Sequence, residues 1–107
     1  MKDISPPDLA RWLADKARKK PVLLDVREDW EFQTCHIAGS KLVPMGDVPS
    51  HLGEMDAGDD IVVICHHGNR SRHVGAFLEE QGFKKVYNLA GGVDAWAQTV
   101  DSSMPTY

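Results

Sequence analysis

Residues 61–72 read IVVICHHGNRSR, and this segment decides both the fold and the site that we expect. Its first four residues are apolar without alternation, which predicts a short strand buried on both faces, as in a parallel sheet. The strand ends at Cys65. After a short loop a helical pattern begins, because Val74, Phe77 and Leu78 fall at i, i+3 and i+4. The segment therefore predicts a strand, a tight loop and a helix, with Cys65 at their junction.

The loop has the composition of an anion site with a nucleophile at its base. A chain that passes from a strand into a helix N-terminus points backbone N–H groups inward, and the helix dipole adds positive charge there. A cysteine in that position has its thiolate favoured. Arg70 supplies a guanidinium, Gly68 permits a tight backbone, and Ser71 suits the cap or first residue of the helix. The alternative is that Cys65 is a small apolar filler at an ordinary strand-to-helix turn.

Cys65-His66-His67-Gly68-Asn69-Arg70-Ser71 resembles the active-site loop of the rhodanese-like sulfurtransferases. The likeness runs from about residue 4 to residue 96 and includes, in the order of the family, Leu24-Asp25-Val26-Arg27-Glu28, Glu31-Phe32, His36-Ile37-Ala38-Gly39-Ser40, Val86-Tyr87-Asn88-Leu89, Gly91-Gly92 and Trp96. The resemblance implies a rhodanese-like three-layer α/β sandwich, with about five mostly parallel strands and helices on both faces. It also implies that Cys65 is catalytic and that His66, His67, Gly68, Asn69, Arg70 and Ser71 bind the substrate.

Length and composition limit the alternatives. The 107 residues predict one domain, with a core at about residues 4–98 and a short mobile tail at 99–107. The formal charge of −4 argues against binding to nucleic acid or to an anionic membrane surface. No apolar run is long enough to cross a bilayer, and the N-terminus lacks the layout of a signal peptide. We expect a soluble, cytoplasmic protein whose two cysteines are free thiols.

The remaining elements are predicted from periodicity and from turn residues. Helices are expected from Ser5 to about residue 17, from Glu28 to Gln33, over residues 47–55, from the loop to about Gln81 with Gly82 as its stop, and around Val93 and Trp96. Strands are expected at residues 22–26 and 85–88, with a brief edge strand at Leu42-Val43-Pro44. Gly91-Gly92 is expected to bring the chain close to its neighbours.

Asp25 ends the predicted strand at residues 22–26, so it shares with Cys65 the edge of the sheet where ligands gather. It is therefore a candidate for the edge of the site, and the alternatives are that it caps a turn or pairs with an arginine. Arg27 and Glu31 stand four residues apart and are expected to pair as a structural clamp. Cys35 occupies the position before His36, where the family more often has glycine. It is a second thiol that could resolve an oxidised Cys65 only if the two sulfurs meet.

Three histidines, His66, His67 and His73, follow Cys65 closely, which raises the question of a metal. Adjacent histidines in a tight loop rarely aim at one ion, and no second cysteine or carboxylate stands at the short spacing of zinc sites. We therefore expect no metal and no cofactor. His66 and His67 are expected to contribute backbone N–H groups to the loop and side chains to its rim, where protonation would attract anions.

The expected activity is a two-step sulfur transfer. A small sulfur-containing anion such as thiosulfate donates its outer sulfur to Cys65, and cyanide, a thiol or a protein then accepts it. One alternative is a persulfide carrier or a partner-binding module with weak thiosulfate activity. The other is a cysteine-dependent phosphatase of the cell-cycle or arsenate-reductase kind. Four residues separate Cys65 from Arg70, one fewer than in those phosphatase loops, and this spacing favours sulfur over a phosphoryl group.

Overall fold

The computed structural model describes residues 1–107. Along the chain it contains β1 (Lys2–Ile4), α1 (Pro6–Ala14), β2 (Val22–Asp25), α2 (Asp29–Thr34), β3 (Lys41–Leu42), the 3₁₀ helix η1 (Met45–Glu54), β4 (Ile61–Ile64), α3 (Asn69–Glu80), β5 (Val86–Leu89) and α4 (Gly92–Thr99). The alternation of strands and helices follows the expected order, and every predicted element is present within a few residues of its predicted bounds.

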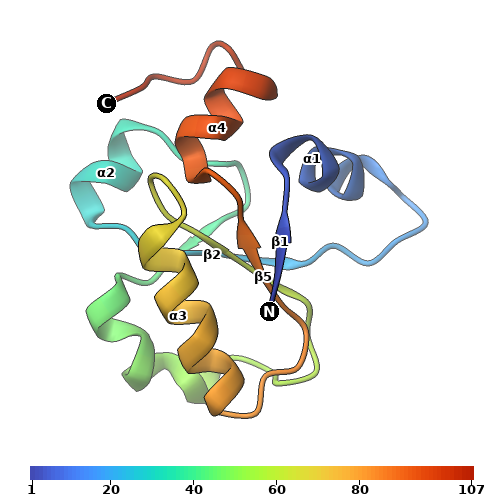
Figure 1. Cartoon of the computed structure of the whole chain (residues 1–107), viewed down its shortest axis with the longest axis vertical. Coiled ribbons are helices and arrows are strands. Elements are labelled where there is room, and N and C mark those ends of the chain that lie inside the picture. Colours follow the sequence, from blue (N-terminus) through green and yellow to red (C-terminus); the bar gives the residue numbers. More distant parts are fainter.

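The five strands form one sheet in the order β1-β5-β4-β2-β3, and all neighbouring strands are parallel (Figure 1). The predicted segment at residues 61–64 is the central strand β4, whose residues are all fully buried. Asp25 at the end of β2 lies opposite Ile64, so the loop after β4 leaves the sheet at the edge that Asp25 also reaches. The expected α/β sandwich is confirmed.

Helices cover both faces of the sheet and create two hydrophobic cores. One core lies under α1 and α4 and includes Val62 and Ile64, and the other lies under α3 and η1 and includes Ile61 and Val63. β4 contributes to both because successive strand residues point to opposite faces. Cys35 belongs to the first core and Cys65 to the second, and both are free thiols. None of the helices is both long and apolar enough to cross a membrane.

Three elements differ from the prediction. β1 was not expected, because its three residues are largely exposed and the strand forms only by pairing with β5 at the edge of the sheet. α1 ends at Ala14 rather than near residue 17, because Asp15 is extended and its N–H returns to the carbonyl of Trp12. The predicted helix at residues 47–55 is a 3₁₀ helix that contains Pro49, a residue without the N–H that a regular helix uses.

The C-terminal segment, expected to be a mobile tail, is packed against the domain in the structure. After α4 it turns back toward α2 and ends above that helix (Figure 1). Met104 joins the core beneath α1 and α4, and the hydroxyl of Tyr107 donates to Glu31 and accepts from Arg27. The sequence of this segment is polar and contains proline. Its contacts with α2 could therefore not be predicted from the local sequence.

Candidate active site

Cys65 lies directly after β4, and only 1% of it is exposed. Its Sγ accepts a hydrogen bond from the N–H of Gly68 at 3.0 Å and lies 3.3 Å from the Oγ of Ser71. Gly68 has φ of +102°, a conformation that favours glycine. A Cβ at this position would also lie 3.3 Å from the N of Gly91. The loop therefore turns one backbone N–H onto the sulfur at a point where only glycine fits without strain.

Ser71 is neither the cap nor the first residue of the helix, so this prediction was wrong. Gly68 occupies the N-cap position and α3 begins at Asn69, which places Ser71 in the first turn with its side chain completely buried. Its hydroxyl donates to the side-chain oxygen of Asn88, whose Nδ2 donates to Asp3 at 3.2 Å. Sequence reasoning missed Asn88. The only indication of its role is that a polar residue occupies a buried position of β5.

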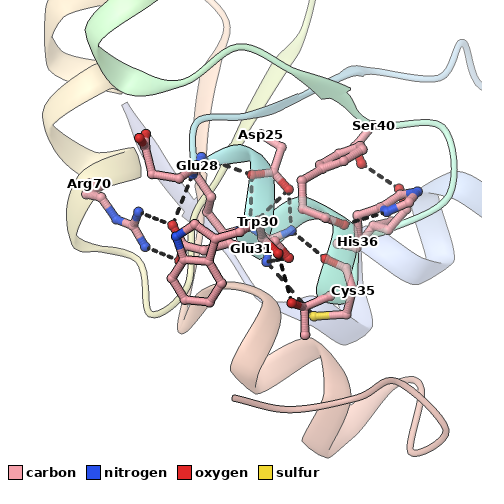
Figure 2. Close-up of polar contacts among 12 residues, drawn as sticks. Asp25, Glu28, Trp30, Glu31, Cys35, His36, Ser40 and Arg70 are labelled. Atoms are coloured by element: carbon pink, nitrogen blue, oxygen red, sulfur yellow. Dashed lines mark hydrogen bonds and ion pairs between the residues drawn. The ribbon is translucent and has the colours of Figure 1, made fainter.

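Arg70 forms a two-pronged ion pair with Glu31 (Figure 2). Its Nη1 and Nη2 lie 2.7 and 2.8 Å from the two carboxylate oxygens, and its side chain is 33% exposed. The hydrogen bonds from Arg70 lower the pKa of Glu31 to about 2, against the opposing effect of burial. The same bonds raise the pKa of Arg70, so both groups stay charged at neutral pH. The pair ties α2 to the first turn of α3, directly after the loop that follows Cys65.

The expected ion pair between Arg27 and Glu31 does not form, because each of these residues pairs with another partner. The only atom of Glu31 that accepts a hydrogen bond from Arg27 is the backbone oxygen, at 3.2 Å. The guanidinium of Arg27 forms its ion pair with Asp25 instead. The two groups are completely buried, with Nε–Oδ1 and Nη2–Oδ2 distances of 2.9 and 2.7 Å. Arg27 also donates to the carbonyl of Cys35 and to the Tyr107 hydroxyl. Of the alternatives for Asp25, pairing with an arginine is therefore the one found.

The rim of the loop is formed by His66, which stacks on Tyr107, and by His67, whose ring is tilted against that of His66. The His66 ring lies 3.9 Å from that of Tyr107 and 3.8 Å from that of His67, measured between centroids. Burial, together with the neighbouring His67, lowers the pKa of His66, so this ring is neutral at neutral pH. His67 is exposed, and its Nε2 lies 3.9 Å from Oδ2 of Asp94. The rim is therefore polar, and His66 adds little positive charge to it.

The predicted site residue Asn69 and the third histidine, His73, form no hydrogen bond with the Cys65 sulfur. Asn69 is exposed at the start of α3, and it forms no hydrogen bond with another side chain. His73 lies on the same helix and lines a separate small cavity with Met45 and Val48. The structure therefore separates His73 from the other two histidines.

The start of α4 holds the backbone of the loop. Val93 N–H donates to the Cys65 carbonyl at 2.9 Å, and Asp94 N–H donates to the His66 carbonyl at 3.1 Å. A Cβ on Gly92 would lie only 2.3 Å from the Cys65 oxygen, closer than real contacts allow. The close approach predicted at Gly91-Gly92 is thus confirmed, and it occurs at the loop that carries the candidate nucleophile.

The model of the Rhodanese-like domain family matches residues 6–99. The chain belongs to the rhodanese-like domain family. Its fold agrees with this assignment: the crystal structure of a rhodanese-like domain protein from Staphylococcus aureus superimposes with a TM-score of 0.85 at 30% identity, covering 100% of this chain and 99% of that one. The human single-domain sulfurtransferase TSTD1 gives a TM-score of 0.83, and at 23% identity it supports the fold alone.

Two relatives of this rhodanese-like domain are named for different functions. The present chain is 34% identical over 83 residues to the thiosulfate sulfurtransferase GlpE of Stutzerimonas stutzeri, and the alignment covers 78% of this chain and 76% of GlpE. It is 40% identical over 74 residues to the putative sulfur carrier protein YrkF of Bacillus subtilis, covering 69% of this chain. The chain spans 40% of the length of YrkF and 38% of that of an Arabidopsis thaliana rhodanese-like/PpiC domain-containing protein.

Proposed function

We propose that this protein is a sulfurtransferase that moves a sulfane sulfur from a donor such as thiosulfate to a thiophilic acceptor through a persulfide on Cys65. The observation that carries the proposal is the position of the Cys65 sulfur. It lies at the end of the central strand, beside the N-terminus of α3, and a backbone N–H points at it from Gly68 at 3.0 Å. Anions are stabilised at helix N-termini, so both a thiolate and the terminal sulfur of a persulfide fit this place.

The first step is attack by the Cys65 thiolate on the outer sulfur of thiosulfate. A new S–S bond forms, the S–S bond of thiosulfate breaks, and its electron pair leaves with sulfite. In the second step, cyanide or an acceptor thiolate attacks the outer sulfur and releases the Cys65 thiolate. Neither step requires a proton, which agrees with a site beside which His66 is neutral.

Within this proposal Arg70 contributes to donor binding and to the shape of the loop. A guanidinium offers five N–H donors, and two of them point at Glu31. The others remain for the oxyanion of the donor, because the side chain is one-third exposed. Gly68 and Ser71 would act on the sulfur, while His66, His67 and Asn69 would line the entrance. We place this chemistry in a reducing, cytoplasmic setting, in keeping with two free thiols.

A persulfide carrier is the second candidate, and the charge distribution favours it. The guanidiniums nearest the loop are all paired, Arg70 with Glu31, Arg27 with Asp25 and Arg72 with Asp3. A dianion such as thiosulfate is attracted less strongly by cations that are already paired with carboxylates than by free ones. A protein-bound persulfide carries less charge and would suit this rim better. The similarity to YrkF, named a putative sulfur carrier, points the same way.

Intact-mass measurement of the reduced protein after incubation with thiosulfate tests the proposal. We expect a gain of one sulfur atom in the wild type and in Cys35→Ser, no gain in Cys65→Ser, and reversal by cyanide. A gain that persists in folded Cys65→Ser would refute the nucleophile assignment. No gain with thiosulfate, but a gain with a persulfide donor, would identify the carrier. Hydrolysis of an aryl phosphate that depends on Cys65 would show a phosphatase instead.

A further inference from the structure

Three potential metal ligands meet at the entrance to the loop. The ligand atoms of His66, His67 and Asp94 all lie within 4.8 Å of one another. Residue spacing did not predict this group, because no carboxylate stands close to the histidines along the chain. The carboxylate comes from the first turn of α4, and His73, the third histidine after Cys65, is not part of the group.

The backbone fixes the relative positions of these three side chains. The N–H of Asp94 donates to the carbonyl of His66 at 3.1 Å, so two of the residues are joined directly through the main chain. Gly92 permits this approach because a Cβ there would lie 2.4 Å from the same His66 oxygen. Histidine and aspartate have short side chains, so the group is held more firmly than a cluster of long surface side chains would be.

His66 is also held in place by an aromatic neighbour. Its ring stacks on that of Tyr107, with the centroids 3.9 Å apart and the planes 10° from parallel. Stacking restricts the orientation of the ring, and neither of its nitrogens forms a hydrogen bond with another protein group, so one nitrogen is available to a cation.

We propose that His66, His67 and Asp94 bind a divalent cation of the zinc class, with water in the open position. Two imidazoles and a carboxylate are a ligand set that zinc accepts, at bond lengths of about 2.0–2.2 Å. Two ligand atoms on one tetrahedral ion then lie roughly 3.4 Å apart. The ligand atoms are now 3.9 Å apart for His67 and Asp94 and at most 4.8 Å apart within the group. The exposed His67 ring, which is tilted by 34° against that of His66, has to rotate for all three ligands to reach one ion. The bound ion adds positive charge beside the Cys65 loop, where the guanidiniums are all paired.

Calorimetric titration with Zn²⁺ tests this site independently of sulfur transfer. The titration uses the full chain carrying Cys65→Ser, so that the thiolate cannot be the ligand. We expect one equivalent of zinc to bind. His67→Ala and Asp94→Asn should each weaken binding at least about tenfold, by comparison with losses known for outer-shell partners. His73→Ala is the matched control, since it removes an exposed histidine a few residues away, and it should leave the affinity unchanged.

A second measurement follows the ligands themselves. In histidine NMR spectra, one equivalent of Zn²⁺ should move the imidazole signals of His66 and His67 but not that of His73. Absence of binding would overturn the proposal. So would binding that His67→Ala and Asp94→Asn leave intact, or that His73→Ala weakens equally, because both results would indicate adventitious surface binding only. Circular dichroism of each variant establishes that a loss of binding is not a loss of fold.

Discussion

Arg70 and Glu31 stand 39 residues apart in the chain, yet their side chains meet through two hydrogen bonds of 2.7 and 2.8 Å. This pair connects α2 with the first turn of α3, which follows the Cys65 loop. Glu31 in turn accepts from the N–H of Glu28 and from the hydroxyl of Tyr107. One buried carboxylate therefore joins the loop, a helix and the C-terminal segment, and a change at this point affects both stability and the loop.

Arg70→Ala is expected to reduce both catalysis and stability. Removal of one oxyanion-type donor lowers the rate of thiosulfate turnover about a hundred- to a thousandfold. The buried Glu31 also loses its partner, and we expect the free energy of unfolding to fall by about 2–3 kcal/mol. This is less than the roughly 3–5 kcal/mol of a fully buried pair, because Arg70 is partly exposed. Steady-state kinetics and urea denaturation provide the two values.

The double variant Glu31→Gln with Arg70→Ala separates the two effects. If the stability loss comes from the unpaired carboxylate, the double variant should be more stable than Arg70→Ala alone, while its turnover stays low. Equal turnover in Arg70→Ala and the wild type would exclude Arg70 from donor binding.

The lowered pKa of Glu31 predicts how the free energy of unfolding changes at acid pH. Its pKa is about 2 in the folded protein, against an ordinary value of 4.5, mainly because of the hydrogen bonds from Arg70. Between these two values the unfolded chain binds more protons, so the free energy of unfolding rises with pH. The contribution of Glu31 is complete above pH 4.5 and is lost as the pH falls through 2. Denaturation at a series of acid pH values should show a shallower slope for Glu31→Gln than for the wild type.

The hydrogen bond from Ser71 to Asn88 predicts a change in the reactivity of Cys65. While the Ser71 hydroxyl donates to Asn88, it can only accept from the Cys65 sulfur, 3.3 Å away. Asn88→Ala frees the hydroxyl to donate to a thiolate, so alkylation of Cys65 at neutral pH should become several times faster. Ser71→Ala has no hydroxyl that could donate to the thiolate, so it should not show this acceleration. Acceleration in both variants would indicate a loosened core instead.

Gly92→Ala is expected to damage the loop without touching a polar side chain. Its φ of +61° disfavours any other residue, and the new Cβ would collide with the backbone oxygens of Cys65 and His66. Overpacking of this kind destabilises by about 1–3 kcal/mol, and here it also moves the nucleophile. Thermal unfolding and persulfide formation measure the two effects. Gly46→Ala is the control, since no atom lies within 4 Å of its Cβ position, and it should change neither property.

The parts of the fold that the sequence predicted have local signals. The apolar run at residues 61–64 and the helical spacing after it predicted β4 and α3 without knowledge of any partner. The features that were missed depend on partners distant in sequence. The spacing of four residues predicted that Glu31 pairs with Arg27. In the fold Glu31 pairs with Arg70, which comes from a different element. Asn88 likewise acquires its role only when β5 lies beside the helix that carries Ser71.

The contact between Tyr107 and His66 yields a last prediction, which concerns the C-terminal segment. Burial is the main cause of the lowered pKa of His66, and the Tyr107 ring stacked at 3.9 Å supplies part of that cover. Tyr107→Ala should therefore raise the pKa of His66 toward its ordinary value of 6.5, as measured by NMR titration. Tyr107→Phe keeps the ring but removes the hydroxyl that bonds Glu31 and Arg27, so it should lower stability by about 0.5–1.5 kcal/mol and leave the pKa of His66 low. If the pKa of His66 is the same in the wild type and in Tyr107→Ala, the segment does not cover the histidine in solution, and the mobile tail expected from its composition would describe it better.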